Sequence, residues 1–169
     1  MALTEGEARA RAEATVRAHC GWHVAPVKDE TITLDGPGTG ALLLPSLHVV
    51  DVLTITEDGA ELTPAIDYSW SVSGAVRRYP ESWRVDSQGR WTGNFRAVVV
   101  ELTHGFDQWP LDVLAVIDRL VARAMSGAGV LSQVGAVSFA TGQDGLPLSD
   151  SLSTTDKAAL GPYVLPFRP

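Results

Sequence analysis

Histidines, a cysteine and carboxylates supply the residue types that metal or acid–base chemistry requires. The densest cluster is His19-Cys20-Gly21-Trp22-His23, whose two histidines stand four residues apart. Gly21 interrupts the helix that would place both on one face, and no further Cys, Asp or Glu follows at the spacing of a zinc site. We therefore predict no metal site here and interpret Trp22 as a core anchor at a helix end.

A second candidate is the pair His104 and Asp107, which lie on either side of Gly105-Phe106 after a predicted strand. A histidine near a carboxylate can act as a general acid or base, but the same residues suit a strand-to-helix corner with His104 bonded to the backbone. No Ser stands in a Gly-x-Ser-x-Gly turn, and the glycines of 36–40 lead into a strand without the Lys-Ser/Thr of a phosphate loop. We predict no catalytic residue and no cofactor, with a small hydrolase centred on this pair left open.

Two of the tryptophans stand in a polar loop between Tyr79 and Phe95. These are Trp83 and Trp91, the two that we expect to be exposed. Exposed indoles on a β domain can stack on sugar rings, and they can equally pin a loop or fill a subunit interface. We therefore treat Trp83 and Trp91 as possible subunit-interface residues, with a carbohydrate- or ligand-binding β domain as the alternative.

The C-terminal tail is apolar and alternating. Tyr163, Leu165 and Phe167 recur at every second position, and Pro166 and Pro169 favour an extended, non-helical chain. Such a segment either folds back on its own domain or docks elsewhere, for instance along a sheet edge or in a groove of a partner. The residues alone leave both possibilities open.

Helices and strands must position these residues. Thr4 and Glu7 have the spacing of a capping box, which predicts a helix over 4–18. Its small-residue face suits close packing, either on its own domain or on another subunit. Apolar spacing predicts a second helix over 110–126, with Pro110 at its first position, and a short helix over 153–160 capped by Ser153 or Thr154 and closed by the glycine and proline at 161–162. We expect four residues of the second helix in the core: Leu111, Leu114, Ile117 and Val121.

The region 31–103 has the pattern of short strands joined by tight turns. We expect hairpin connections at 35–40, 57–60 and 73–74, which predict an antiparallel sheet or a small sandwich. The alternating segment 133–140 suits an extended arm. The resulting fold class is α+β.

Composition restricts the class of protein further. The 169 residues carry a net charge of −7 and are 45% hydrophobic, which fits one globular domain. A nucleic-acid binder would need a basic face, although an acidic wall suits a passage that DNA crosses without binding.

Cys20 is the single cysteine, so no intrachain disulfide is expected. The first 17 residues lack the apolar core of a signal peptide, and no apolar run approaches the about 20 residues that span a bilayer. We expect a soluble protein made in the cytosol, with no membrane partner.

Several short motifs occur in a characteristic order. They are Cys20-Gly21-Trp22-His23-Val24-Ala25-Pro26, Leu34-Asp35-Gly36, Leu42-Leu43-Leu44-Pro45-Ser46-Leu47, Asp67-Tyr68-Ser69-Trp70, Thr103-His104-Gly105-Phe106 leading to Pro110, and Tyr163-Val164-Leu165-Pro166. In this order and spacing the chain resembles the head-to-tail adaptor (connector) proteins of long-tailed bacteriophages, particularly those of actinobacteria. The resemblance spans about residue 5 to residue 169 and assigns no role to the stretches 79–95 and 141–152.

The resemblance implies a small helical bundle with an inserted antiparallel β-sheet or sandwich. It implies a single adaptor domain over 1–161 and a docking tail over 162–169. Such proteins form a twelve-fold ring between the portal protein of the phage head and the stopper protein on the tail side, and DNA passes through the ring without specific binding. By resemblance the portal-docking residues are Tyr163, Val164, Leu165 and Pro166, and the alternation adds Phe167. We therefore expect a non-enzymatic protein of the virion neck, assembled in the host cytoplasm.

Overall fold

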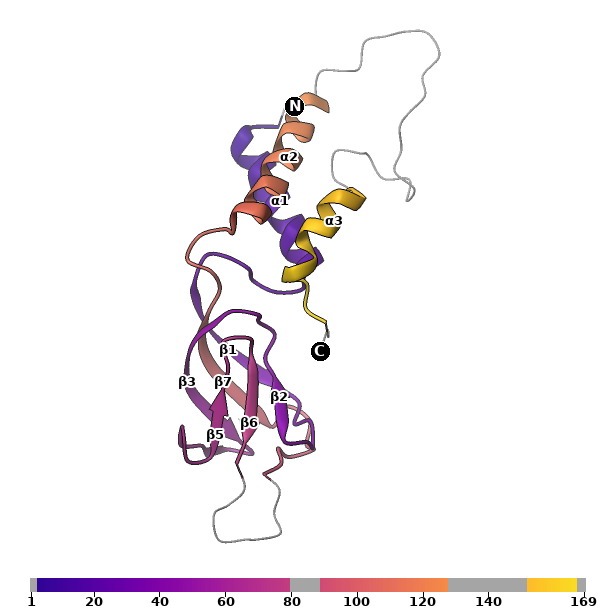
Figure 1. Ribbon diagram of the computed structural model, residues 1–169. Helices are drawn as coiled ribbons and strands as arrows, with labels where there is room; N and C mark the ends of the chain where they lie inside the picture. The colour runs from indigo at the N-terminus through magenta and orange to yellow at the C-terminus, as the bar shows by residue number, and fades with distance from the viewer. Residues whose placement is uncertain (1–2, 80–88, 128–151, 167–169) are drawn as a thin grey trace. The chain divides into compact units, whose positions relative to one another are not determined.

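The computed structural model describes residues 3–79, 89–127 and 152–166. Contacts group these residues into two compact units. The helical unit contains the described residues within 1–22 and 109–164, and the β unit contains those within 23–108 together with 165–166. Three helices in one unit and two antiparallel sheets in the other confirm the expected α+β class (Figure 1). The predicted arm at 133–140 lies outside the described residues, and the domain boundary at 161 stays a prediction. No helix within the described ranges is long and apolar enough to cross a membrane.

Helix α1 spans Glu5–Cys20, two residues longer at its end than predicted. The predicted capping box is present, because Thr4 Oγ1 accepts from the Glu7 backbone at 3.3 Å and the Glu7 carboxylate accepts from the Thr4 backbone at 2.9 Å. The helix ends where Gly21 adopts a left-handed φ of 81°. Helix α1 packs on α2 of the same chain. Its buried face consists mostly of small residues: Ala8, Ala12, Val16 and Cys20.

Helix α2 spans Leu111–Gly127 and begins one residue after Pro110, whose carbonyl accepts from Leu114 at 2.8 Å. Its buried face is Val113, Val116, Ile117 and Leu120. The predicted core of α2 is therefore correct only for Ile117: Leu111 is 83% exposed, and Leu114 and Val121 are half-buried. Both sets have helical spacing, and contact with α1 and α3 selects the face one residue earlier.

Helix α3 (Thr154–Leu160) is tied to α2 through a buried carboxylate. Ser153 caps α3, and its hydroxyl donates to Asp156 Oδ2 at 2.7 Å. Arg119 donates to Asp156 Oδ1 at 2.9–3.0 Å, and Arg123 donates to Oδ2. Burial alone raises the pKa of Asp156, but the hydrogen bonds from Ser153, Arg123 and Arg119 outweigh it and lower the pKa to about 2. The carboxylate is thus held charged although its side chain is only 1% exposed.

The chain does not stop helical winding at Gly161 as predicted. It continues into a 3-10 turn, η1 (Gly161–Tyr163), with Gly161 in right-handed helical geometry. Pro162 is compatible with this because a proline in the first turn of a helix lacks only an N–H that would have no partner there. The expected non-helical tail therefore starts at Val164, not at Tyr163.

The β unit is a two-sheet sandwich. The strands are β1 (Lys28–Leu34), β2 (Ala41–Leu43), β3 (Val49–Glu57), β4 (Ala60–Glu61), β5 (Tyr68–Trp70), β6 (Ala75–Arg78) and β7 (Val98–His104). One sheet has the order β1-β7-β3-β4 and the other β2-β6-β5, with antiparallel pairing between neighbours. Side chains of both sheets share one core, to which β3, β6 and β7 contribute Ile55, Val76 and Val100.

Two of the three predicted tight turns are confirmed. Asp58 and Gly59 both adopt left-handed φ values between β3 and β4, and Gly74 has a φ of 83° before β6. A Cβ at Gly74 would lie 2.2 Å from the carbonyl oxygen of Ser46, so this position requires glycine on two grounds. The hairpin predicted at 35–40 is wrong, because β1 and β2 belong to different sheets. The connection crosses between the sheets instead, and Gly38 donates to the carbonyl of Thr92 at 2.9 Å.

Candidate functional site

The cluster at 19–23 has no site geometry. Cys20 is fully buried, and burial raises the pKa of its thiol to about 11. His23 Nε2 lies 2.7 Å from the carbonyl oxygen of Pro26. Trp22 is 6% exposed, which confirms it as a core anchor, and its indole N–H donates to the carbonyl of Tyr163 at 2.7 Å. Within the described residues, no group of three His, Cys, Asp or Glu side chains is arranged to hold a metal ion.

His104 is a buried residue of strand β7. Its Nε2 lies 2.9 Å from Glu30 Oε2 on the neighbouring strand, and the Lys28 ammonium lies 3.0 Å from the same oxygen. The expected bond from His104 to the backbone is therefore wrong. Burial lowers the pKa of His104 more strongly than the Glu30 carboxylate raises it, which favours a neutral ring. With the ring 2% exposed and Asp107 exposed outside this pair, the arrangement joins β1 to β7 and offers no surface for a substrate.

Trp91 lies in the sandwich core. Its side chain is 2% exposed, so the expectation that Trp91 is exposed is wrong. The reason is backbone pairing. The Trp91 backbone N–H donates to the carbonyl oxygen of Thr39 at 2.9 Å, and this bond holds the end of the loop against the 36–40 connection. A sugar-stacking platform consequently cannot use Trp91. Trp83 lies outside the described residues, and the possible subunit-interface role of Trp83 and Trp91 stays a prediction.

The described part of the C-terminal tail folds back on its own chain. In the helical unit the Tyr163 hydroxyl donates to Asp112 at 2.9 Å. Burial and the Asp112 carboxylate together raise the pKa of Tyr163 to about 12. In the β unit Leu165 is only 9% exposed, whereas Pro166 is exposed. The sequence allowed the tail either to fold back or to dock on a partner, and in the structure Tyr163 and Leu165 have intramolecular contacts. Phe167 lies outside the described residues.

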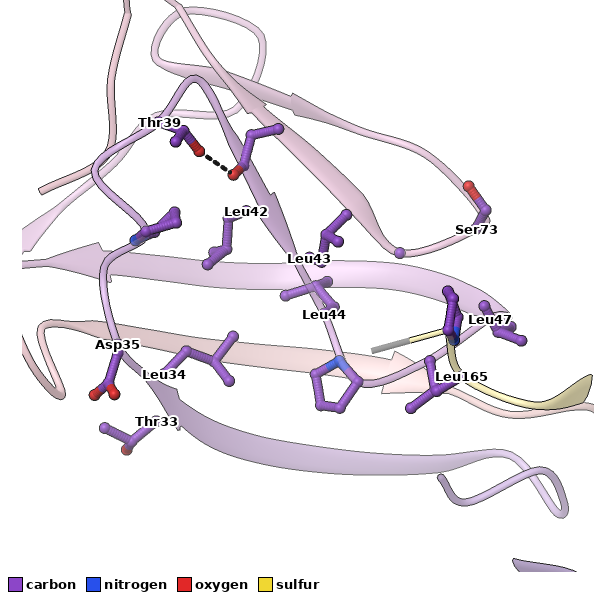
Figure 2. Close-up of a pocket in the computed structure, with 15 residues that line it drawn as sticks. Thr33, Leu34, Asp35, Thr39, Leu42, Leu43, Leu44, Leu47, Ser73 and Leu165 are labelled. Atoms are coloured by element: carbon purple, nitrogen blue, oxygen red, sulfur yellow. Dashed lines mark hydrogen bonds between the residues drawn. The ribbon is translucent and has the colours of Figure 1, made fainter. Parts of the chain in front are cut away.

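An apolar hollow of about 560 Å³ receives this tail. It lies at the side of the sandwich formed by β1 and β2, each of which is an edge strand of its sheet. Figure 2 shows Leu165 at the end of the hollow where Leu47 lies, away from Thr39. The walls carry five leucines in addition to Leu165: Leu34, Leu42, Leu43, Leu44 and Leu47. This run of leucines suits an apolar peptide segment, and Thr33, Asp35, Thr39 and Ser73 are the polar residues of the lining.

Comparison with known proteins places the fold. No protein-family model matches the sequence, and a search of curated proteins finds no match. Among solved structures, the chain is similar to one in the neck of a native gene transfer agent particle with C12 symmetry. The TM-score is 0.53 at 15% identity, over 96% of this chain and 84% of the other. A second similar chain, in the neck of the empty particle with C6 symmetry, has a TM-score of 0.50 at 16% identity, over 96% and 80%.

The structural neighbours are neck proteins of a gene transfer agent particle. At this level of identity the comparison establishes a shared fold over nearly the whole chain. The resemblance to the actinobacteriophage type of adaptor stays a prediction.

Proposed function

We propose that this chain is a structural protein of a virion neck that forms a ring joining the portal of the phage head to the stopper proteins on the tail side. The observation that carries the proposal is the fold shared with neck proteins over 96% of the chain. Those neck structures have C12 and C6 symmetry, which supports a homo-oligomeric ring, twelve-fold in our proposal. Assembly in the host cytoplasm and location in the finished virion neck follow from this role.

Exposed apolar side chains support contacts between copies. A closed ring needs head-to-tail contacts, in which two different faces of each subunit meet. Phe95 is 85% exposed, Ile66 70% and Leu111 83%. Subunit contacts would remove these side chains from water.

Exposed carboxylates lie on β1 and β7 of the four-stranded sheet. Asp29 and Thr31 on β1 stand opposite Thr103 and Glu101 on β7, and both carboxylates are exposed. The whole chain carries a net charge of −7, and a face with exposed carboxylates would not bind the phosphate backbone of DNA. This is consistent with a passage through which DNA moves without specific binding.

The tail residues Tyr163, Val164, Leu165 and Pro166 are the proposed portal-docking segment, with Phe167 as its continuation. Their alternating apolar side chains would add buried area in a partner groove. No catalytic role is proposed for His104, whose ring is buried and lies against Glu30.

The test is electron microscopy of the chain mixed with its cognate portal ring. Full-length protein is compared with a Leu165→Asp variant and with a chain ending at Gly161. Extra ring density with the full-length chain alone would support both the adaptor role and the docking tail. Density with all three would keep the adaptor role and place the anchor in the folded body. A well-formed portal that shows no added density with any of them would refute the proposal.

A further inference from the structure

The hollow beside the edge strands remains only partly filled by the tail. Leu165 and Pro166 belong to its lining, yet a volume of about 560 Å³ remains. Because β1 and β2 are edge strands, each has a backbone side without a partner strand in the described part of the chain. The hollow therefore has the two features of a site for an extended peptide: apolar walls and open strand edges.

The contact between tail and hollow is apolar only. Leu165 is buried to 9% exposure, but neither Leu165 nor Pro166 forms a hydrogen bond in the described structure. The last anchored residue is Val164, whose N–H donates to Gly161 at 3.3 Å and whose backbone is extended at φ −84° and ψ 127°. Moving Leu165 out of the hollow thus needs rotation about one extended linker and breaks no hydrogen bond among the described residues.

We propose that the hollow is an intramolecular binding site for Leu165 and Pro166, and that it competes with the docking of these same residues on a partner. This inference rests on the proposed function, since it concerns the residues assigned to portal docking. The kind of partner that fits is one with an apolar groove for an extended Leu-Pro segment, because that is the environment the hollow provides. When the tail is seated in the hollow for most of the time, only a small fraction of the subunits has a free tail. The apparent docking affinity is then the intrinsic affinity multiplied by that fraction.

A thiol at the tail measures the seating without any partner. In a full-length Leu165→Cys variant, the only other thiol is the fully buried Cys20, so labelling reports on residue 165. We expect labelling on the order of tenfold slower than in the unfolded chain, as the burial of one such side chain implies. Equal rates in the folded and unfolded chains would overturn the proposal.

A matched pair of second substitutions locates the seat. Leu43 lines the hollow and is 53% exposed, whereas Leu53 on β3 lies outside it and is 50% exposed. Leu43→Gln should accelerate labelling several-fold, and Leu53→Gln should leave it unchanged. If Leu43→Gln fails to fold by circular dichroism, Leu47→Gln replaces it, because Leu47 lines the same hollow. The same effect from both members of the pair would contradict a seat in the hollow.

Portal binding then separates the competition from the proposed function. With residue 165 as leucine, Leu43→Gln should bind the portal ring several-fold more tightly than the natural chain, and Leu53→Gln should bind equally. Unchanged affinity, together with accelerated labelling, would overturn the competition and leave the adaptor role intact. Absence of portal binding by every variant would overturn both the adaptor role and the competition, whereas the labelling rates would still decide whether the tail is seated.

Discussion

The buried carboxylate of Asp156 should stabilise the helical unit through its hydrogen bonds to Ser153, Arg119 and Arg123. Its pKa falls from an ordinary 3.8 to about 2, which corresponds to roughly 2.5 kcal/mol of stabilisation at neutral pH. Because the folded-state pKa is the lower one, this stabilisation is present above pH 3.8 and is lost as the pH falls from there toward about 2. Asp156→Asn should remove it at neutral pH, leaving Arg119 and Arg123 in contact with solvent.

Urea unfolding followed by helical circular dichroism measures this effect. We expect Asp156→Asn to lower the free energy of unfolding by roughly 2–3 kcal/mol at pH 7 and to flatten its decline between pH 4 and pH 2. Asp118→Asn is the control, because Asp118 is 62% exposed and pairs with Arg9 at 3.6 Å. That surface pair should contribute less than about 1 kcal/mol. A loss below 1 kcal/mol in Asp156→Asn, or the same acid sensitivity in variant and natural chain, would refute the reasoning.

Three further predictions follow from buried groups and turns. Burial lowers the pKa of His104 below its ordinary 6.5, so the stability of the folded chain should decrease as the pH falls below about 6.5. His104→Gln should reduce this decrease, as measured by thermal melts at pH 7.5 and 5.5. Gly74→Ala should destabilise the β unit by more than Gly59→Ala, since both have a φ of 83° but only Gly74 lies against a backbone carbonyl. Similar losses in urea unfolding would contradict this. Cys20 should resist thiol reagents until the chain unfolds, because its thiol is fully buried with a pKa of about 11.

Local rules succeeded where the deciding contacts are close in sequence. The cap at Thr4 needs only the residue three positions later, and the turns at Gly59 and Gly74 need only a left-handed φ. Alternation also identified strands over 31–103. These features are set by interactions that a short window of sequence contains.

Long-range choices were not visible in the sequence. The polar neighbours of Trp91 indicate exposure, yet pairing with the 36–40 connection buries its indole. The same pairing explains why 35–40 links two sheets. For α2, two adjacent stripes have helical spacing, and only the packing partner separates Val113 from Leu114. The hollow was not predictable because distant segments build it, from Thr33 to the tail at Leu165.

The two ends of the β unit meet, and this affects how the chain folds. Val24 at the entry accepts a hydrogen bond from Phe106 at the exit at 2.8 Å, and Lys28 is paired with His104. Pairing α1 with α2 directly would require closing a loop of about 90 residues. Once the sandwich has formed, the effective loop is on the order of ten residues, which saves about 2 kcal/mol of closure entropy. Formation of the sandwich therefore lowers the entropy cost of pairing the two helices, and strand lengths or turns can change during evolution without altering the separation that the helices must bridge.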